Sequence, residues 1–235
     1  MNTAIVTGAS SGIGLSISKS ILKCGYKVYG FGRDFSKIKN DDILNNSNFR
    51  PITCDLMNTS LLCKKIKEIS KKESNLNLLV NNAGIGYFGP HEELNPKKIH
   101  EMVTVNLEVP LVLSQLLLRQ LKKTQGYIIN ISSIEAKKSS VYGCAYGATK
   151  AGLTHFSESL FDEARKYGVK IITIHPDMTR TNFYRNANFK EAEEYDTYIT
   201  PDQVSCAVEM ALNQRNGLVC TDITLRPQKH KIMRK

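Results

Sequence analysis

The stretch YGATK places a phenol and an ammonium group four residues apart, at Tyr146 and Lys150. Residues with this spacing lie on one face of a helix. A free phenol has a pKa near ~10 and is a poor base at neutral pH, but a neighbouring ammonium stabilises the phenolate and lowers that pKa. The pair could therefore act as a general acid or base. The alternative is an ordinary solvated pair on a helix surface, because one match of this kind arises easily by chance.

A strand with two hydroxyl groups at its end precedes this pair. The sequence IINISS ends in Ser132 and Ser133. A hydroxyl at the end of a strand, beside the tyrosine, could polarise a substrate carbonyl. The three side-chain types together point to acid–base chemistry on a carbonyl or an alcohol.

A glycine-rich turn stands near the start of the chain, directly after an apolar run. It reads TGASSGIG and comprises Thr7, Gly8, Ala9, Ser10, Ser11, Gly12, Ile13 and Gly14. Glycines let the backbone approach a pyrophosphate, and the helix that follows offers free N–H groups and the positive end of its dipole. Ser10 and Ser11 can add hydroxyl donors. A strand before the turn and a helix after it predict a dinucleotide site rather than a turn that serves packing alone.

The end of the second expected strand bears on which dinucleotide is bound. An acidic side chain there accepts hydrogen bonds from ribose hydroxyls, whereas a basic one meets a 2′-phosphate. The sequence reads FGRD, so Arg33 favours NADP(H) through a bidentate phosphate contact. Asp34 would favour NAD(H) if the strand ended one residue later. After the third expected strand, Asp55 could accept a hydrogen bond from the adenine amino group or cap the helix that begins near Thr59.

Short apolar runs alternate with longer amphipathic stretches along the whole chain. The expected strands are residues 3–7, 27–31, 50–54, 77–81, 127–132, 169–175 and 218–225, and the expected helices are residues 12–24, 59–72, 96–122, 145–167 and 201–213. This alternation predicts an α/β fold: one domain over residues 1–235 with a doubly wound, mostly parallel sheet of seven strands and helices on both faces. Residues 179–200 are polar and aromatic and interrupt the alternation. We expect a lid over the site there, the alternative being a surface excursion.

Several motifs occur in one chain in a fixed order: the glycine-rich turn, the run NNAG that begins at Asn81, then Asn106, the pair Ser132–Ser133, and Tyr146 with Lys150. This combination resembles the short-chain dehydrogenase/reductase family over essentially the whole chain. The resemblance implies a Rossmann-type sheet and a nicotinamide cofactor. It also implies hydride transfer between that cofactor and a carbonyl or alcohol carbon of a small molecule.

The resemblance assigns catalytic roles residue by residue. Tyr146 corresponds to the acid–base residue, and Lys150 to the residue that lowers its pKa and binds the nicotinamide ribose. The spacing to Tyr146 favours Ser133 as the carbonyl-polarising hydroxyl, with Ser132 as the alternative. Asn106 resembles an asparagine that holds a water for a proton relay through Lys150. Otherwise it is a polar residue that kinks its helix.

The resemblance also assigns contacts to the cofactor. Residues on the adenosine side are Asp55, Leu56, Asn82, Ala83 and Gly84, and those near the nicotinamide carboxamide are Pro176 and Thr181. The family has Pro-Gly where this chain has Pro176-Asp177, so the backbone or the local charge must differ there. The ending TDITLRPQ resembles the broad carbonyl and hydroxy-acid reductases more than the ketoacyl reductases.

Composition limits the remaining classes. The 235 residues are 41% hydrophobic and 23% charged, which excludes collagen-like and disordered chains. Neither the six cysteines nor the five histidines have metal-ligand spacing, so we expect reduced thiols, no metal site and histidines that titrate as isolated residues. The chain runs from Met1 into an apolar strand with no secretory signal, and the apolar stretch 109–118 is short and interrupted. We therefore expect a cytoplasmic protein without membrane association.

The formal net charge of +10 raises the question of an anionic partner. One alternative function is reduction of 3-oxoacyl groups on an acidic acyl carrier protein. A non-enzymatic alternative is nucleotide sensing or nucleic-acid binding, against which the serine–tyrosine–lysine set argues. A basic tail over residues 226–235 carries five cations and no acid, so much of the excess charge needs no nucleic acid. Residues 107–121 and 151–161 carry more apolar positions than one helix face needs. In the family these two helices form subunit interfaces, so the resemblance implies a homodimer or homotetramer, the alternative being burial within the monomer.

Overall fold

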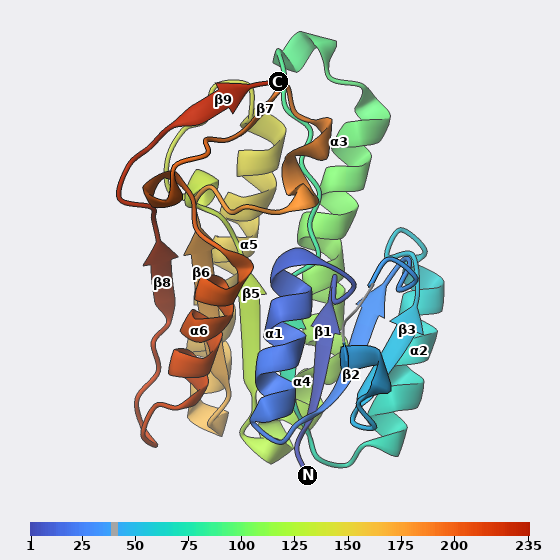
Figure 1. The fold of residues 1–235 in the computed structure, drawn as a ribbon. Helices are drawn as coiled ribbons and strands as arrows, with labels where there is room; N and C mark the ends of the chain where they lie inside the picture. Colours follow the sequence, from blue (N-terminus) through green and yellow to red (C-terminus); the bar gives the residue numbers. More distant parts are fainter. Residues whose placement is uncertain (39–41) are drawn as a thin grey trace.

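The computed structural model describes residues 1–38 and 42–235. Seven strands form one parallel sheet in the order β3-β2-β1-β4-β5-β6-β8, which confirms the expected doubly wound fold (Figure 1). The strands are β1 (Thr3–Thr7), β2 (Lys27–Gly32), β3 (Phe49–Thr53), β4 (Leu76–Asn81), β5 (Tyr127–Ile131), β6 (Lys170–Pro176) and β8 (Asp222–Leu225). Most expected boundaries agree within one or two residues. The last strand begins four residues later than expected, at Asp222 rather than Leu218.

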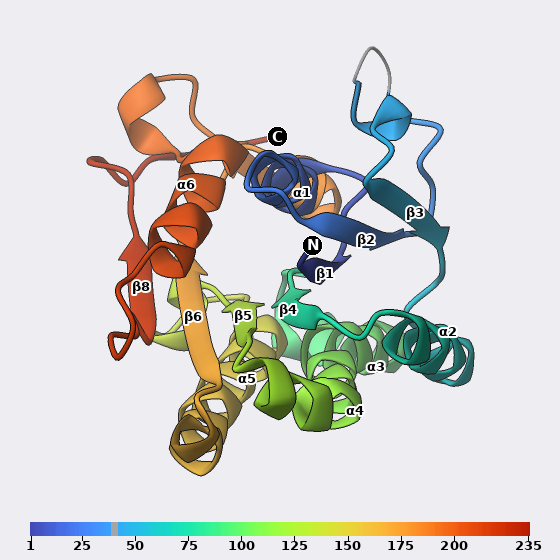
Figure 2. The same ribbon diagram turned by 90° about the horizontal axis from the view of Figure 1, so that it is seen from below.

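Helices cover both faces of the sheet, as Figure 2 shows from below. One face carries α1 (Gly12–Lys23) and α6 (Pro201–Leu212), and the other carries α2 (Thr59–Lys72), α4 (Val109–Thr124) and α5 (Cys144–Ala164). Neighbouring residues of β1 divide between the two cores: Ala4 and Val6 pack with α1 and α6, whereas Ile5 packs with the helices opposite. Burial on both faces explains why the inner strands read as nearly continuous apolar runs, whereas the outer strands β3 and β8 are largely exposed.

The expected helix over residues 96–122 is interrupted. It consists of α3 (Pro96–Val103), a π-helical segment η3 (Thr104–Glu108) and α4. Pro110 has no N–H, so the α-helical hydrogen bond to the Asn106 carbonyl cannot form, and the wider π turn falls at that point. The whole stretch Pro96–Thr124 is long and apolar enough to cross a membrane by composition, which is weak evidence. Met102, Leu113 and Leu117 are fully buried in it, as in the core helix of a globular protein.

The C-terminal residues form structure that the sequence did not predict. Strand β9 (Ile232–Arg234) pairs antiparallel with β7 (Phe189–Glu191) of the 179–200 segment. That segment also contains the short 3-10 helices η6 (Asn182–Asn186) and η7 (Tyr195–Thr197). Residues 226–235 are therefore not a free tail, which corrects the expectation of an unattached basic end.

Candidate active site

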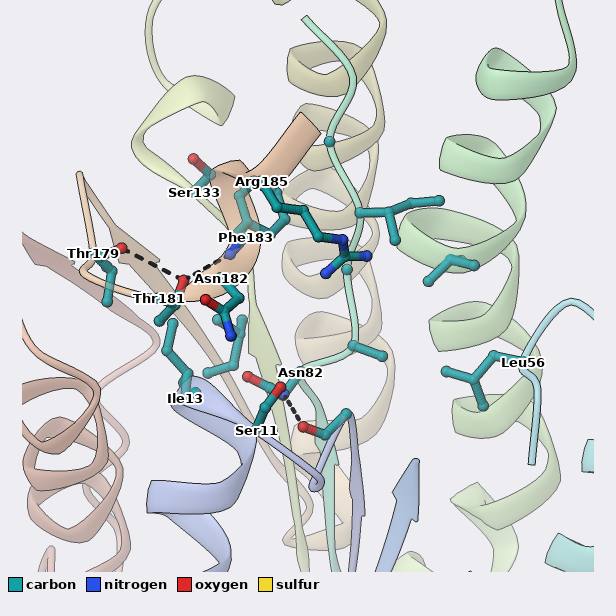
Figure 3. Close-up of a pocket in the computed structure, with 18 of the residues that line it drawn as sticks. Ser11, Ile13, Leu56, Asn82, Ser133, Thr179, Thr181, Asn182, Phe183 and Arg185 are labelled. Atoms are coloured by element: carbon teal, nitrogen blue, oxygen red, sulfur yellow. Dashed lines mark hydrogen bonds between the residues drawn. The ribbon is translucent and has the colours of Figure 1, made fainter. Parts of the chain in front are cut away.

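Most of the predicted site residues line one pocket at the carboxyl ends of the strands. The pocket has a volume of about 370 Å³ and lies where the strand order reverses, between β1 and β4. Figure 3 shows Ser11 and Asn82 at one end, Ser133 at the other and Leu56 to one side. The predicted residues in its lining are Gly8, Ser10, Ser11, Gly12, Ile13, Arg33, Asp55, Leu56, Asn82, Ala83, Gly84, Ser133, Tyr146, Lys150, Pro176 and Thr181. Thr7, Gly14 and Asn106 lie behind this lining.

The glycine-rich turn is held by the segment after β4. Thr7 Oγ1 accepts hydrogen bonds from the backbone N–H groups of Asn82 and Ala83, both at 3.0 Å. The Asn82 side chain donates to the Thr7 carbonyl at 2.8 Å. Gly8 and Gly12 have left-handed φ angles of 70° and 53°, and a Cβ on Gly14 would lie 2.2 Å from the Gly8 carbonyl oxygen. The turn therefore requires glycine at these positions.

The turn leaves donors available for an anion. Ser11 is the N-cap residue of α1, yet its side chain makes no capping hydrogen bond. The first N–H groups of a helix have no partner within it, and they carry the positive end of the dipole. An uncapped helix start beside a glycine cradle fits the diphosphate of a dinucleotide.

Arg33 and Asp34 take different directions at the end of β2. The strand ends at Gly32, one residue later than expected, which is the case in which Asp34 was to act as the ribose acceptor. The Asp34 carboxylate instead accepts hydrogen bonds from the Ser36 N–H at 2.9 Å and the Ser36 hydroxyl at 2.7 Å. These hydrogen bonds lower the pKa of Asp34. Arg33 lines the pocket and Asp34 is outside its lining.

Asp55 is not the cap of α2. Asn58 caps that helix by accepting a hydrogen bond from the Leu61 N–H at 3.0 Å. The Asp55 carboxylate accepts one from the Met57 N–H at 3.0 Å and lines the pocket. The structure thus excludes the capping role of Asp55, and its contact with the adenine stays a prediction.

Ser133, Tyr146 and Lys150 meet at the end of β5. All three side chains are buried, with exposed fractions of 7%, 6% and 3%. The Lys150 ammonium donates to the Ile131 carbonyl at 2.8 Å and lies 5.9 Å from the centre of the Tyr146 ring. Ser132 points away, because its hydroxyl donates to the Lys150 carbonyl at 3.1 Å and lies 3.0 Å from the Thr154 hydroxyl. The geometry thus favours Ser133 over Ser132 as the residue facing the phenol.

Burial governs the proton affinities of this group. Burial raises the pKa of Tyr146 well above its ordinary value, and a hydrogen bond with Ser133 opposes that rise only in part. Burial also lowers the pKa of Lys150 to about 8. Ser133, and not Lys150, is the group that lowers the pKa of Tyr146 here, so the predicted tuning of the phenol by Lys150 stays a prediction. The phenol is therefore protonated at neutral pH.

Asn106 links three parts of the site from the π-helical segment. Its Oδ1 accepts a hydrogen bond from the Ile85 N–H at 2.9 Å, and its Nδ2 donates to the Ile85 carbonyl at 2.8 Å. Nδ2 also lies 3.1 Å from the Thr149 hydroxyl on α5. The side chain is fully buried and fixes the loop after β4 against the helix that carries Tyr146 and Lys150.

The family model for short chain dehydrogenases matches residues 2–192. The chain belongs to this family. It is 28% identical over 225 residues to an uncharacterised oxidoreductase of Staphylococcus epidermidis, covering 95% of this chain and 96% of that protein. It is 31% identical over 195 residues to a 3-oxoacyl-[acyl-carrier-protein] reductase of Buchnera aphidicola, covering 82% of this chain and 80% of the relative.

Solved structures of the family have the same fold. An alcohol dehydrogenase of Thermococcus sibiricus, complexed with 5-hydroxy-NADP, matches with a TM-score of 0.87 at 24% identity over 98% of this chain and 99% of that one. A metagenomic short-chain oxidoreductase in complex with NADP matches with a TM-score of 0.81 at 26% identity over 96% and 97%. The chain is thus a short-chain dehydrogenase/reductase with the nicotinamide-dinucleotide fold of that family.

This short-chain dehydrogenase compensates for the aspartate that replaces the family glycine after Pro176. Asp177 is buried, and one carboxylate oxygen accepts a hydrogen bond from the Met178 N–H at 2.8 Å. The other lies 3.4 Å from Nε of Arg226. The expected difference in local charge is therefore offset by a cation from the C-terminal segment.

Residues 179–200 bring aromatic side chains over Tyr146. Thr181 caps η6 by accepting from the Phe183 N–H at 3.2 Å. The rings of Phe88 and Phe183 each lie 5.5 Å from the Tyr146 ring. We call Phe88, Tyr146, Phe183, Tyr184 and Phe189 the aromatic cluster. The aromatic residues of the 179–200 segment were visible in the sequence, but their position over Tyr146 was not. Phe88, which completes the cluster, comes from the loop after β4, far away in the chain.

His175 was also missed as a residue of the site. It is fully buried at the end of β6, with Nδ1 3.1 Å from the Ser133 carbonyl oxygen and Nε2 3.0 Å from the Asp222 carboxylate. Burial lowers its pKa, so the expectation of an isolated titrating histidine is wrong here. Its ring positions the backbone of Ser133. Across residues 1–38 and 42–235, no group of three or more His, Cys, Asp or Glu side chains could hold a metal ion.

Proposed function

We propose that the protein is an oxidoreductase that interconverts a carbonyl and a secondary alcohol on a small molecule and prefers NADP(H). The observation that carries this proposal is that Ser133, Tyr146 and Lys150 line the same pocket as the glycine-rich turn. A pure binding module has no use for a buried phenol beside a serine and a lysine. In this proposal the glycine-rich turn binds the nucleotide and the acid–base group acts on the substrate in the same reaction.

Each residue has a defined part in the reaction. The nicotinamide, when bound, supplies or accepts the hydride. Tyr146, a phenol that is protonated at neutral pH and whose pKa burial raises further, donates its proton to the carbonyl oxygen during reduction. Ser133 donates a hydrogen bond to the same oxygen and stabilises the charge that develops there. Lys150 holds the ribose hydroxyls, and Asn106 keeps the surrounding loop and helix in place.

The preference for NADP(H) is supported by Arg33 at the pocket and by Asp34 turned onto Ser36. The test is a screen of NADPH and NADH oxidation over ketones, aldehydes and oxo acids. We expect turnover with NADPH on at least one carbonyl class and a lower Kd for NADPH than for NADH. Arg33→Ala should raise the Kd of NADPH by about tenfold or more, because one charge-assisted phosphate contact is lost, and should leave that of NADH unchanged. Tighter binding of NADH by the wild type would overturn the preference.

A second candidate is reduction of 3-oxoacyl groups on an acyl carrier protein. It is supported by the Buchnera aphidicola relative of that name and by the net charge of +10, which would attract an acidic carrier. Activity on a carrier-bound ketoester far above that on free ketones would favour this candidate. Comparable activity on both would favour the small-molecule reductase.

We also propose a homodimer or homotetramer in a reducing cytoplasm. Leu116 and Leu118 of α4 and Phe156 and Phe161 of α5 are only partly buried at the edge of the core, which supports pairing of these helices between subunits. The six free cysteines are compatible with a reducing compartment. Light scattering coupled to gel filtration measures the mass in solution, and a monomer would contradict the proposal.

A further inference from the structure

Within residues 1–38 and 42–235, two guanidinium groups of the pocket have no hydrogen-bond or ion-pair partner. The pocket is lined by three cationic side chains, Arg33, Lys150 and Arg185. Lys150 donates to the Ile131 carbonyl at 2.8 Å. Arg33 and Arg185 make no hydrogen bond or ion pair with any residue of the part of the chain that the structure describes. Two free guanidiniums in one pocket indicate that the pocket receives more than one anionic group.

Arg185 enters this pocket from the lid. It lies on η6, whose start is fixed by the Thr181 cap. Figure 3 shows its guanidinium reaching across the pocket toward the segment that follows β4. The phenol of Tyr87, in that segment, donates to the Glu101 carboxylate at 2.6 Å. This hydrogen bond raises the pKa of Tyr87, and both Arg185 and Arg33 oppose the rise, so both cations lie within electrostatic reach of one phenol.

We propose that Arg185 binds the diphosphate of the nucleotide from the lid side of the pocket. This inference rests on the proposed nucleotide binding. The uncapped start of α1 offers donors from one side of the pocket, and Arg185 offers a fork of N–H donors from the other. Arg33, at the end of β2, is left for the ribose 2′-phosphate. A bound nucleotide would then add a further contact that holds the lid residues where they already lie, over Tyr146.

The test is equilibrium binding of NADPH and NADH to four proteins: wild type, Arg185→Ala, Arg185→Lys and Arg33→Ala. The protein contains no tryptophan, so the fluorescence of the reduced nucleotide itself reports binding. Because both nucleotides carry the diphosphate, Arg185→Ala should raise both Kd values by about tenfold or more. Arg185→Lys should recover part of the loss, and Arg33→Ala should affect NADPH alone. Arg215→Ala, an exposed arginine outside the pocket, is the matched control.

The possible failures are distinguishable. Unchanged Kd values for both nucleotides in Arg185→Ala would overturn the inference. A raised KM for a carboxylated substrate with unchanged nucleotide Kd would also overturn it, by moving Arg185 to a substrate carboxylate. If the wild type bound neither nucleotide, the proposed function itself would be wrong.

A separate set of contacts ties the C-terminal segment to the lid. Residues 226–235 pair with β7 through β9, and Figure 1 shows these two strands side by side above the sheet. The Lys229 N–H donates to the Asp196 carbonyl at 2.8 Å, and its ammonium lies 2.7 Å from the Asp196 carboxylate. Lys231 pairs with Glu194. Lys235 donates through its N–H to the Asn188 carbonyl at 2.9 Å and through its ammonium to the Tyr184 carbonyl at 2.6 Å.

These contacts act on the lid residues nearest to Tyr146. Tyr184 follows Phe183 in η6, and Phe189 in β7 packs on both Tyr184 and Phe88 at ring distances of 5.4 and 5.3 Å. We infer that residues 226–235 are a strap that positions the lid over the catalytic tyrosine. Two cations of the strap, Lys229 and Lys231, pair with acids of the lid and have no part in the active site.

A double charge reversal tests the strap. Lys229→Glu with Lys231→Glu places like charges opposite Asp196 and Glu194. Each exposed pair contributes little, so together with the new repulsion we expect KM for the carbonyl substrate to rise about fivefold with a smaller change in kcat. Trypsin should cleave after Lys190 faster than in the wild type, as mass spectrometry would show.

Reversal of the partners distinguishes a strap from a general loss of structure. Adding Asp196→Lys and Glu194→Lys restores the pairs with opposite sense and should restore KM and the slow cleavage. Lys71→Glu, at the exposed end of α2, is the control for a change in net charge. Unchanged KM and unchanged cleavage in the double variant would overturn the inference, as would failure of the partner reversal to rescue either readout.

Discussion

Tyr146 carries a proton at neutral pH, because burial holds its pKa above the ordinary phenol value of 10.0, and that proton is the one the proposed reduction needs. Tyr146→Phe removes the hydroxyl and keeps the ring that packs against Phe88 and Phe183. We expect kcat to fall by about 10²- to 10⁴-fold, the usual contribution of a general acid. The Kd of NADPH and the circular dichroism spectrum should stay unchanged. Near-normal turnover in this variant would contradict the assigned role.

Lys150 predicts a pH dependence for nucleotide binding. Burial lowers its pKa to about 8, so the ammonium is present below that pH and is lost above it. An anionic nucleotide stabilises the charged form, so its Kd should rise as the pH increases through about 8. The measurement is Kd of NADPH against pH, with calorimetry in two buffers to detect proton uptake at alkaline pH. Lys150→Arg keeps its charge and should show no break there. The same pH profile in both proteins would contradict this origin.

The identity of these residues was predictable from the sequence, whereas their proton affinities were not. The spacing of Ser133, Tyr146 and Lys150 is local and fixes them at the end of one strand and the start of one helix. The pKa of Tyr146 depends on how much water Phe88 and Phe183 exclude. Those rings come from separate loops, so no pattern around residue 146 reports them.

At the scale of elements, the glycine-rich turn depends on its third glycine. A Cβ on Gly14 would lie 2.2 Å from the Gly8 carbonyl oxygen and 2.4 Å from the Asn82 amide. Gly14→Ala must therefore displace the turn, at a cost of about 1–3 kcal/mol of unfolding free energy, as for other overpacked sites. We expect nucleotide binding to weaken more than stability. Lys23→Ala, on the exposed side of the same helix, is the control, and an unchanged Kd for NADPH in Gly14→Ala would contradict the prediction.

Elements that the apolar pattern of the sequence marks were predicted, whereas strands that only their pairing with a distant strand defines were not. The strands of the main sheet are apolar runs bounded by turns, and they carry their own signal. Strands β7 and β9 have three residues each and lie about forty residues apart, so only their mutual pairing defines them. The π turn at Asn106 was likewise hidden, because the apolar pattern continues through Pro110 on both sides.

At the scale of the whole molecule, strand order decides where the site lies. The reversal between β1 and β4 separates the loops at the carboxyl ends and opens the pocket between them. The cationic side chains of the molecule also fall into groups with different surroundings. Arg33 and Arg185 face the pocket, whereas Lys229 and Lys231 of the strap pair with acids of the lid.

A polar network lies near the amino ends of β1 and β2, away from the pocket at the carboxyl ends of the strands. It supports stability without taking part in the chemistry. Glu73, after the end of α2, accepts hydrogen bonds from the Tyr29 hydroxyl at 2.7 Å and the Lys27 ammonium at 2.9 Å. Burial alone would raise the pKa of Glu73, but these hydrogen bonds lower it below its ordinary value of 4.5. A carboxylate with a lowered pKa stabilises the fold above the unfolded value, and this contribution is lost as the pH falls through the folded pKa.

Glu73→Gln should therefore lower the free energy of unfolding at pH 7 by about 1–3 kcal/mol, the usual worth of hydrogen bonds to a charged group. The difference from the wild type should shrink as the pH falls below about 4.5, because the wild-type carboxyl then becomes neutral as well. Urea unfolding at neutral and acidic pH measures both values. Glu68→Gln, exposed on the same helix, should change neither. The network lies at the amino ends of the strands and Tyr146 at their carboxyl ends. The kcat of Glu73→Gln should therefore equal that of the wild type wherever the variant is folded. A loss of kcat under those conditions would show that the amino and carboxyl ends of the strands are coupled.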